Sequence, residues 1–172
     1  MNQHYRQILK WLVYMLLFMV MAVLETIVLP YLTLFGAHAK LLPLAAAMVA
    51  ALEGGVPGAL YGVFAGLICD ALIPPFEAVH MIYFFLSGLL IGHLVAALFK
   101  KTYVTAALCA VVSLAALDFI LLLVFYLIPG RAGLDSLLRV TLPEIAFSAL
   151  LTPLVYWPIK AISKRWEKAE EE

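Results

Sequence analysis

Long apolar stretches recur along the chain and limit its fold more than any other feature. Trp11–Leu29 is a run of 19 residues in which Glu25 is the one charged residue. A helix of about 20 apolar residues is long enough to cross the hydrocarbon core of a membrane. The 172-residue chain is 66% hydrophobic and 13% charged, and a soluble protein of this composition would expose too much apolar surface. These features predict an all-α integral membrane protein with no room for a separate soluble domain.

The order of apolar and turn-forming segments predicts one domain, residues 1–172, that forms a compact bundle of six transmembrane helices. Gly54-Gly55 and Pro57 separate a short second helix from the third, since proline is tolerated in the first turn of a helix. Residues 131–140 are mixed in polarity and are expected to lie along the membrane interface. The charged tail, residues 163–172, is expected to be solvated or frayed. The predicted spans are residues 11–29, 41–53, 57–73, 78–99, 103–128 and 142–162.

The distribution of Lys and Arg favours six spans with both termini in the cytoplasm. With a cytoplasmic N-terminus, six spans place 8 of the 11 Lys and Arg residues inside and 3 outside. If residues 41–53 do not cross, the split becomes 4 inside and 7 outside, against the usual excess of positive charge on the cytoplasmic side. A cleaved signal peptide is the competing interpretation of the first run, because Ala37-His38-Ala39 has the pattern of a cleavage site. The length of the run favours a retained span.

Glycines at intervals of four residues dominate the predicted third span. Residues four apart lie on one inclined row of a helix, so these glycines form a groove without side chains. Such a groove lets a second helix approach closely, and packing of this kind holds helices together in lipid. A further pair with the same spacing occurs in the fourth span. The six glycines predicted to pack helices are Gly54, Gly58, Gly62, Gly66, Gly88 and Gly92.

Five acidic residues lie within or next to the predicted spans, where an ionised side chain needs a partner, a wet cavity or a proton. One interpretation is that most of them reach an interface or cap a helix. Glu144 follows Pro143 and would fit the first turn of a helix, where a carboxylate meets the positive end of the helix dipole. The other interpretation is an outer polar cluster of Asp70, His80 and Glu144 for docking or ligand binding. The five acids are Glu25, Glu53, Asp70, Asp118 and Glu144. The candidate polar or partner-binding residues are Glu53, Asp70, His80, Asp118 and Glu144.

The sequence contains no residue pattern typical of catalysis or of a cofactor site. It lacks a nucleophile–base pair, a phosphate-binding loop and a metal-ligand motif. His80 and His93 are 13 residues apart, which is not the spacing of two metal ligands on neighbouring helical turns. Cys69 and Cys109 lie in apolar runs and are expected to be reduced thiols. We therefore expect no cofactor, no bound metal and no enzymatic activity, with an intramembrane enzyme as the least favoured alternative.

Four segments resemble the bacterial rod shape-determining protein MreD family over most of the chain. They are ETIVLPYLTLFG after the first run, ALEGGVPGALYGVFAGLICD, HMIYFFLSGLLIGHL with His80 ten residues after Asp70, and LPEIAFSALLTPLVYWPIK. Two positions depart from the family. Lys40 stands where the family often has an acidic residue, and Ala78 stands where a glycine is common before the histidine.

The resemblance implies a non-enzymatic scaffold of the cell-elongation complex in the bacterial cytoplasmic membrane, which supports cell shape and peptidoglycan synthesis. The family is similar in architecture to the substrate-binding components of energy-coupling-factor transporters. The expected partners of the protein are MreC, RodA with its penicillin-binding transpeptidase, MreB and membrane lipid. No nucleic acid is expected to bind. The alternative function is a component of such a transporter for a vitamin or a metal. Against it, the first span has a single alanine, Ala22, where that family often carries an alanine-x-x-x-alanine face.

Overall fold

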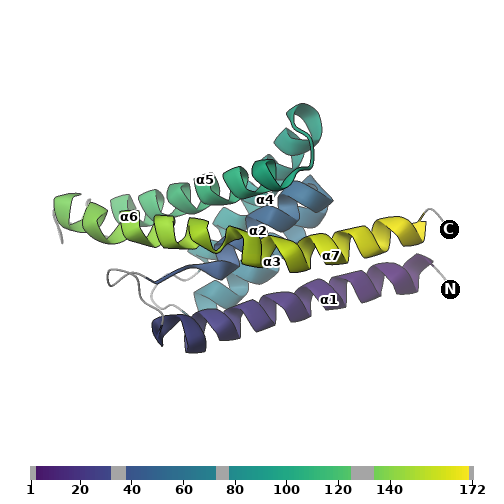
Figure 1. Ribbon diagram of the computed structural model, residues 1–172, viewed down its shortest axis with the longest axis horizontal. Coiled ribbons are helices and arrows are strands. Elements are labelled where there is room, and N and C mark those ends of the chain that lie inside the picture. The colour runs from purple at the N-terminus through teal and green to yellow at the C-terminus, as the bar shows by residue number, and fades with distance from the viewer. Residues whose placement is uncertain (1–2, 32–37, 73–77, 125–133, 171–172) are drawn as a thin grey trace.

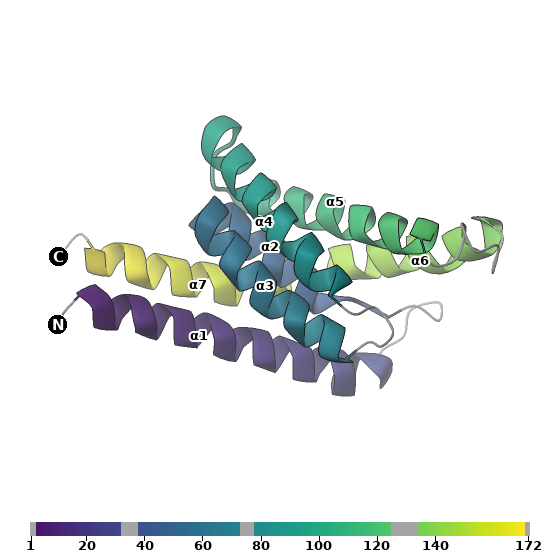
Figure 2. The same cartoon turned by 180° about the vertical axis from the view of Figure 1, so that it is seen from behind.

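A computed structural model describes residues 3–31, 38–72, 78–124 and 134–170, and all regular structure in these ranges is helical. The start of α1 and the end of α7 lie at the same end of the molecule, and the two helices run side by side (Figures 1 and 2). The helices are α1 (Gln3–Val23), α2 (Leu41–Glu53), α3 (Gly55–Leu72), α4 (Val79–Leu98), α5 (Tyr103–Leu122), α6 (Leu134–Leu150) and α7 (Thr152–Glu170).

The first apolar run forms one continuous helical segment. After α1 the chain continues into a π-helical turn, Leu24–Val28, and a 3₁₀ turn, Leu29–Tyr31. A π-helical turn locally widens the helix and often marks a functional position, and Glu25 lies in this one. The stretch Gln7–Tyr31, with 25 residues, is long and apolar enough to cross a membrane.

The short helix α2 is the centre of the fold. It has 13 residues, and every residue from Leu41 to Leu52 is buried. Helices α1, α3, α4, α5 and α7 all pack against it, which explains why a helix so uniformly apolar has no exposed face. At 1.5 Å per residue α2 is about 20 Å long, shorter than the hydrocarbon core of about 30 Å.

Glycines allow α3 and α4 to pack closely as neighbouring helices. A Cβ added at any of five glycines would overlap the backbone of a facing helix: Gly58 faces Ala50 of α2, Gly62 and Gly66 face Phe84 and Met81 of α4, and Gly88 and Gly92 face Gly58 and Gly55 of α3. The contact is therefore between backbones, with no side chain to hold the helices apart. Figure 2 shows α3 and α4 running side by side over much of their length.

Gly54 has a different role from the other predicted packing glycines. It lies between α2 and α3 with φ at 103°, and a Cβ built on it would have no atom within 4 Å. Gly54 thus lies in the turn before the helical row, although a Cβ built on Gly92 would overlap its carbonyl carbon, and its part in helix packing stays a prediction. Glycine is favoured there because the left-handed backbone conformation strains other residues, and this turn lets the chain reverse from α2 into α3.

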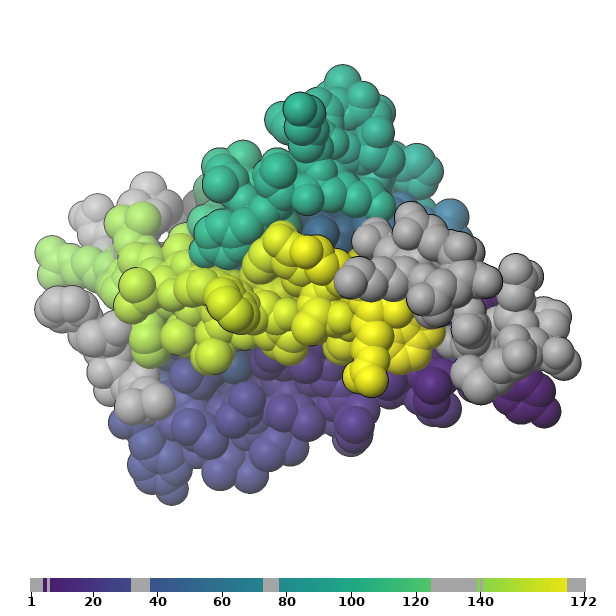
Figure 3. All heavy atoms as spheres, turned by 45° about the vertical axis from the view of Figure 1, so that its right-hand side comes forward, coloured from purple at the N-terminus to yellow at the C-terminus, as the bar shows by residue number. Residues whose placement is uncertain are grey.

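The C-terminal third differs most from the sequence prediction. Residues 134–140 are the first turns of α6 and not a separate helix, so Pro143 lies inside α6 and Glu144 lies well beyond its first turn. The predicted span 142–162 is broken at Leu151, where α6 and α7 meet at a bend of 46°. Helix α7 then continues to Glu170, so residues 163–170 are helical and not frayed. In Figure 3 the side chains of α7 lie between α1 below and α4 and α5 above.

Among the described residues, four helical segments are long and apolar enough to cross a membrane, or five if the bent pair α6–α7 counts as one span. These segments are consistent with an integral membrane protein. The count of six spans requires α2 to cross as well, and it stays a prediction because α2 is shorter than the usual crossing helix.

Candidate functional site

A cluster of charged side chains lies where α1 ends and α2 begins, at the end of the molecule away from the two termini (Figure 1). The ammonium nitrogen of Lys40 is 2.6 Å from Oδ1 of Asp118 on α5 and 3.1 Å from Oε1 of Glu144 on α6. The backbone N–H of Lys40 donates to Oγ of Ser148, also on α6, at 3.0 Å. Glu25 interacts electrostatically with both Lys40 and Glu144. We call the four side chains of Glu25, Lys40, Asp118 and Glu144 the Lys40 cluster.

Glu25 caps α2 from a different helix. Its Oε2 accepts hydrogen bonds from the backbone N–H groups of Leu41 and Leu42, both at 2.9 Å. Lys40 occupies the N-cap position but has no acceptor in its side chain, so the cap must come from elsewhere. A carboxylate here satisfies two N–H groups that have no partner within the helix, and it meets the positive end of the helix dipole. The π-helical turn thereby ties α1 to the start of α2.

Lys40 is the one cation among three acids in the Lys40 cluster. Burial alone would lower the pKa of Lys40, but the carboxylates of Asp118 and Glu144 outweigh this effect and raise the pKa above its ordinary value. The ammonium group is therefore protonated at neutral pH. Asp118 is 5% exposed, and its Oδ2 has no hydrogen-bond partner among the described residues. Lys40 is its ion-pair partner and, through Asp118 and Glu144, holds α5 and α6 to the start of α2.

A cavity of about 300 Å³ opens beside the Lys40 cluster. Its lining includes the charged side chains of Glu25, Lys40 and Glu144 and apolar side chains such as Leu42 and Leu72. Within the described ranges, no group of three or more His, Cys, Asp and Glu residues is arranged to hold a metal ion.

Asp70 and His80 form a second carboxylate cap. Oδ1 of Asp70 accepts from the backbone N–H of His80 at 3.1 Å and lies 2.8 Å from Nδ1 of the same histidine. Oδ2 accepts from the N–H of Met81 at 3.0 Å. The N-cap residue of α4 is Ala78, which has no capping group, so Asp70 at the end of α3 provides the cap. The same arrangement thus starts α2 and α4.

Glu53, at the end of α2, lies in a separate polar group. It pairs with the ammonium group of Lys10 and accepts a hydrogen bond from the Tyr14 hydroxyl at 2.6 Å. Both partners belong to α1. The Glu53 carboxylate therefore ties α1 to the end of α2, as Glu25 ties it to the beginning.

A groove between α4 and α5 provides an apolar surface of a different kind. Its volume is about 240 Å³. The hydroxyl of Tyr83 on α4 donates to the backbone oxygen of Ser113 on α5 at 2.6 Å and closes one part of it. Several wall residues are largely exposed, with Leu90 and Leu108 both at 62%. We call this surface the α4–α5 groove; its exposed wall residues are Leu90, Leu94, Phe99, Leu108, Val112 and Ala116.

The structure brings some of the sequence candidates together and separates others. Asp70 and His80 are direct partners, whereas Asp118 and Glu144 meet at Lys40 and Glu53 lies with Lys10. Sequence reasoning missed Lys40 as the residue that joins the last two acids. Its position immediately before a buried apolar helix was a usable signal, because a lysine there needs an acidic partner.

The two cysteines and two of the histidines lie on helices α3, α4 and α5. Cys69 is buried and Cys109 is half-buried, and neither forms a disulfide. His93 is exposed, and its Nδ1 lies 2.7 Å from the backbone oxygen of Leu89, while its ring lies against Gly55. The two histidines thus belong to opposite ends of α4.

Comparison with known families gives one match. The model of the family described as rod shape-determining protein MreD matches residues 5–163. No curated protein and no solved structure gives a significant match. The matched range includes both carboxylate caps, the Lys40 cluster and the α4–α5 groove.

Proposed function

Since the chain belongs to the family of the rod shape-determining protein MreD, we propose that it acts as a non-enzymatic membrane scaffold of the cell-elongation complex. The family places it in rod shape determination. In our proposal it binds MreC and, through MreC or directly, RodA with its penicillin-binding transpeptidase, and so supports peptidoglycan synthesis. Contact with MreB at the cytoplasmic face belongs to the same proposal.

The observation that carries this proposal is the α4–α5 groove. Isolated exposed leucines are ordinary in a lipid-facing helix, but here exposed apolar side chains from two helices line one concave surface. Association in lipid depends on close packing, and a groove offers more contact to a partner helix than a convex helix face does. The occupant we propose is the transmembrane helix of MreC, which would lie between α4 and α5.

The topology that we propose has six spans, with α2 as a short crossing helix buried inside the bundle. The common end of α1 and α7 would face the cytoplasm, as the distribution of Lys and Arg favours, and the Lys40 cluster would lie toward the outer side of the inner membrane. An architecture like that of the transporter substrate-binding components remains part of the proposal. No observation favours the transporter function itself.

The test is co-purification with groove variants. The tagged protein is expressed with its genomic neighbours and solubilised gently, and the recovered partners are identified. Leu90→Trp and Leu108→Trp fill the groove and are expected to reduce MreC recovery about tenfold or more. A side chain that does not fit costs about 1–3 kcal/mol, and a loss of about 1.4 kcal/mol in binding free energy weakens affinity tenfold.

The matched control is Leu67→Trp, at a leucine of α3 that is 51% exposed and outside the groove. It should leave recovery unchanged. Equal MreC recovery with all three variants would contradict the groove as the binding surface. Recovery of an ATPase pair with a bound small molecule, in place of MreC, would contradict the scaffold function and indicate a transporter component.

A further inference from the structure

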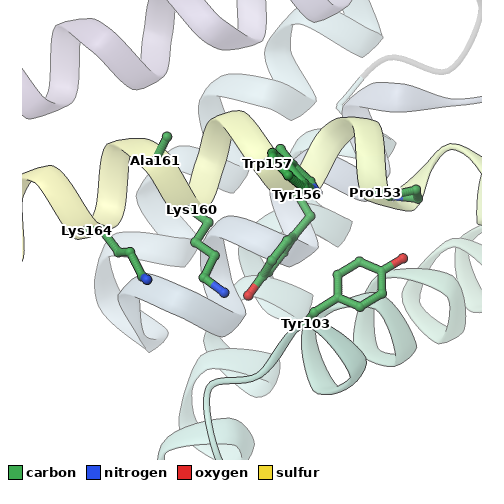
Figure 4. Close-up of a pocket in the computed structure, with 7 residues that line it drawn as sticks. All are labelled: Tyr103, Pro153, Tyr156, Trp157, Lys160, Ala161 and Lys164. Carbon is green, nitrogen blue, oxygen red and sulfur yellow. The ribbon is translucent and has the colours of Figure 1, made fainter.

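A third hollow lies between the start of α5 and the C-terminal helix α7, and it differs from the α4–α5 groove in having charge. Its volume is about 530 Å³. Aromatic rings form its wall, with Tyr103 from α5 and Tyr156 and Trp157 from α7, and Lys160 and Lys164 extend into it from the next two turns of α7 (Figure 4). We call this surface the α5–α7 groove.

The buried hydroxyl of Tyr156 has no partner within the described part of the chain. The residue is 3% exposed, and its oxygen accepts and donates no hydrogen bond there. Buried hydroxyls nearly always have a partner, so one without it calls for an explanation. By contrast, the hydroxyl of Tyr103 is 3.0 Å from Oγ1 of Thr152, so the two tyrosines of the groove are not equivalent.

The unpartnered hydroxyl lies beside two ammonium groups. The Lys160 ammonium is 5.0 Å from the centre of the Tyr156 ring. Figure 4 shows the Tyr156 hydroxyl and the ammonium groups of Lys160 and Lys164 on the same side of α7. Residues four apart share a helix face, so both lysines reach the same space. Neither forms a salt bridge with an acid whose side chain is described. Three donors therefore lie on one side of α7 with no acceptor among the side chains that the structure describes.

The surroundings fit an anionic group that is attached to an apolar chain. Residues 152–166 contain Lys160, Lys164 and Arg165 and no acid. Trp157 is 76% exposed and stands next to the charged turns, as aromatic side chains do at the membrane–water interface. The groove thus combines a cationic end with an aromatic wall, which is how basic pockets between transmembrane helices bind lipid headgroups.

We propose that the α5–α7 groove binds the phosphodiester of an anionic phospholipid such as phosphatidylglycerol. The Tyr156 hydroxyl and the two lysine ammonium groups donate to the phosphate oxygens, and an acyl chain lies along Trp157. The hydroxyl that lacks a partner in the free protein gains one in the complex. This inference requires a membrane around the protein but does not rest on the identity of its protein partners.

The experiment measures lipid retention by the full chain in phosphatidylcholine nanodiscs with and without phosphatidylglycerol, together with thermal unfolding. Tyr156→Phe removes only the unpartnered hydroxyl, so this variant should fold normally and unfold at the same or a slightly higher temperature in phosphatidylcholine. It should bind phosphatidylglycerol about tenfold more weakly, because it loses a hydrogen bond to a charged acceptor. The double variant Lys160→Gln/Lys164→Gln should lose at least as much affinity.

The matched control is Lys100→Gln/Lys101→Gln, which removes the same charge from two exposed lysines outside the groove and should retain the lipid. Wild-type affinity in Tyr156→Phe, or an equal loss in the control, would overturn the proposal. Equal stabilisation by phosphatidylcholine would show that the anionic charge is not recognised. Equal stabilisation by inorganic phosphate would show an adventitious anion site in place of a lipid site.

Discussion

The two sides of the α4–α5 groove are held to the core by different forces. On one side, α4 contacts α3 through glycines, so that the two backbones touch. On the other side, α5 packs against α2 through apolar side chains such as Leu114 and Leu117 and is also tied to the start of α2 by the partly buried ion pair of Asp118 with Lys40. Glycine packing is rigid because it leaves no side chain to rearrange, whereas an ion pair depends on both charges. We infer that α4, packed against α3, forms the fixed wall of the groove and α5 the adjustable one.

This difference fits a protein whose function is to hold partners. In lipid, helices gain little from burying apolar side chains, so an exposed leucine is not by itself unfavourable. A rigid wall can give a partner helix a defined register, and a less rigid wall can adapt to it. Each of the following substitutions tests one side of this comparison.

The largest effect is expected on the glycine side, from Gly66→Leu. A Cβ at Gly66 already overlaps the backbone of Met81, so the helices must separate, and the cost should exceed the roughly 1–3 kcal/mol of ordinary overpacking. We expect little folded protein by size-exclusion chromatography in detergent. The exposed neighbour Leu67→Ala is the control and should behave as wild type. Normal recovery of Gly66→Leu would show that the α3–α4 contact is not rigid.

On the ionic side, Lys40→Met should destabilise the protein by about 3 kcal/mol, because it leaves Asp118 buried without its counter-charge. The measurement is thermal unfolding of the purified protein. The double variant Lys40→Met/Asp118→Leu removes both charges and should recover most of the lost stability. If the single variant unfolds at the wild-type temperature, Lys40 does not hold α5.

Asp70→Ala removes the carboxylate that caps α4 and should cost about 1–2 kcal/mol. The N–H groups of His80 and Met81 would lose their acceptor, and the first turn of α4 would loosen. Hydrogen exchange of that turn is the direct measurement. Asp70→Asn keeps one acceptor oxygen and should have a smaller effect; equal protection in all three proteins would contradict the cap.

Ala78→Gly should stabilise the same helix start by up to about 1 kcal/mol. Ala78 has φ at 62°, a left-handed conformation that strains a residue with a Cβ and that glycine adopts freely. The unfolding temperature of the variant should therefore be higher than that of the wild type by a few degrees, roughly. An unchanged or lower unfolding temperature would show that the strain is absent or is offset elsewhere.

The smallest effect on stability is expected inside the groove. Leu108→Ala shortens a side chain that is 62% exposed, and exposed positions usually change stability by less than about 0.5 kcal/mol. The same variant should nevertheless recover less MreC, because it removes contact from the adjustable wall. A large loss of stability would mean that Leu108 is part of the core and not of a partner surface.

Much of the fold could be predicted from the sequence because apolar length and glycine spacing are local signals. The helical class and the long apolar helices typical of a membrane protein follow from them, whereas the family follows from the resemblance of four longer segments. The end of α2 was also readable, since Gly54-Gly55 marks a turn, although spacing alone could not separate the turn glycine from those in the packing row.

The parts that could not be predicted depend on tertiary contacts. Pro143 suggested a helix start, but a proline can sit inside a helix when neighbouring groups satisfy the freed carbonyl, and α6 continues through it. The partner of Asp118 lies 78 residues away in sequence, and no local pattern links the two. The acids were visible in the sequence, but which of them cap helices and which pair with Lys40 was not.

The most direct test of the central claim is photo-crosslinking from the groove in membranes. A photoreactive residue is placed at Leu90 or Leu108, and in a separate protein at the exposed Leu67 of α3, outside the groove, with MreC present in each case. We predict crosslinks to the transmembrane helix of MreC from both groove positions and none from Leu67. Crosslinks from Leu67 with none from the groove would place the partner elsewhere and contradict the account.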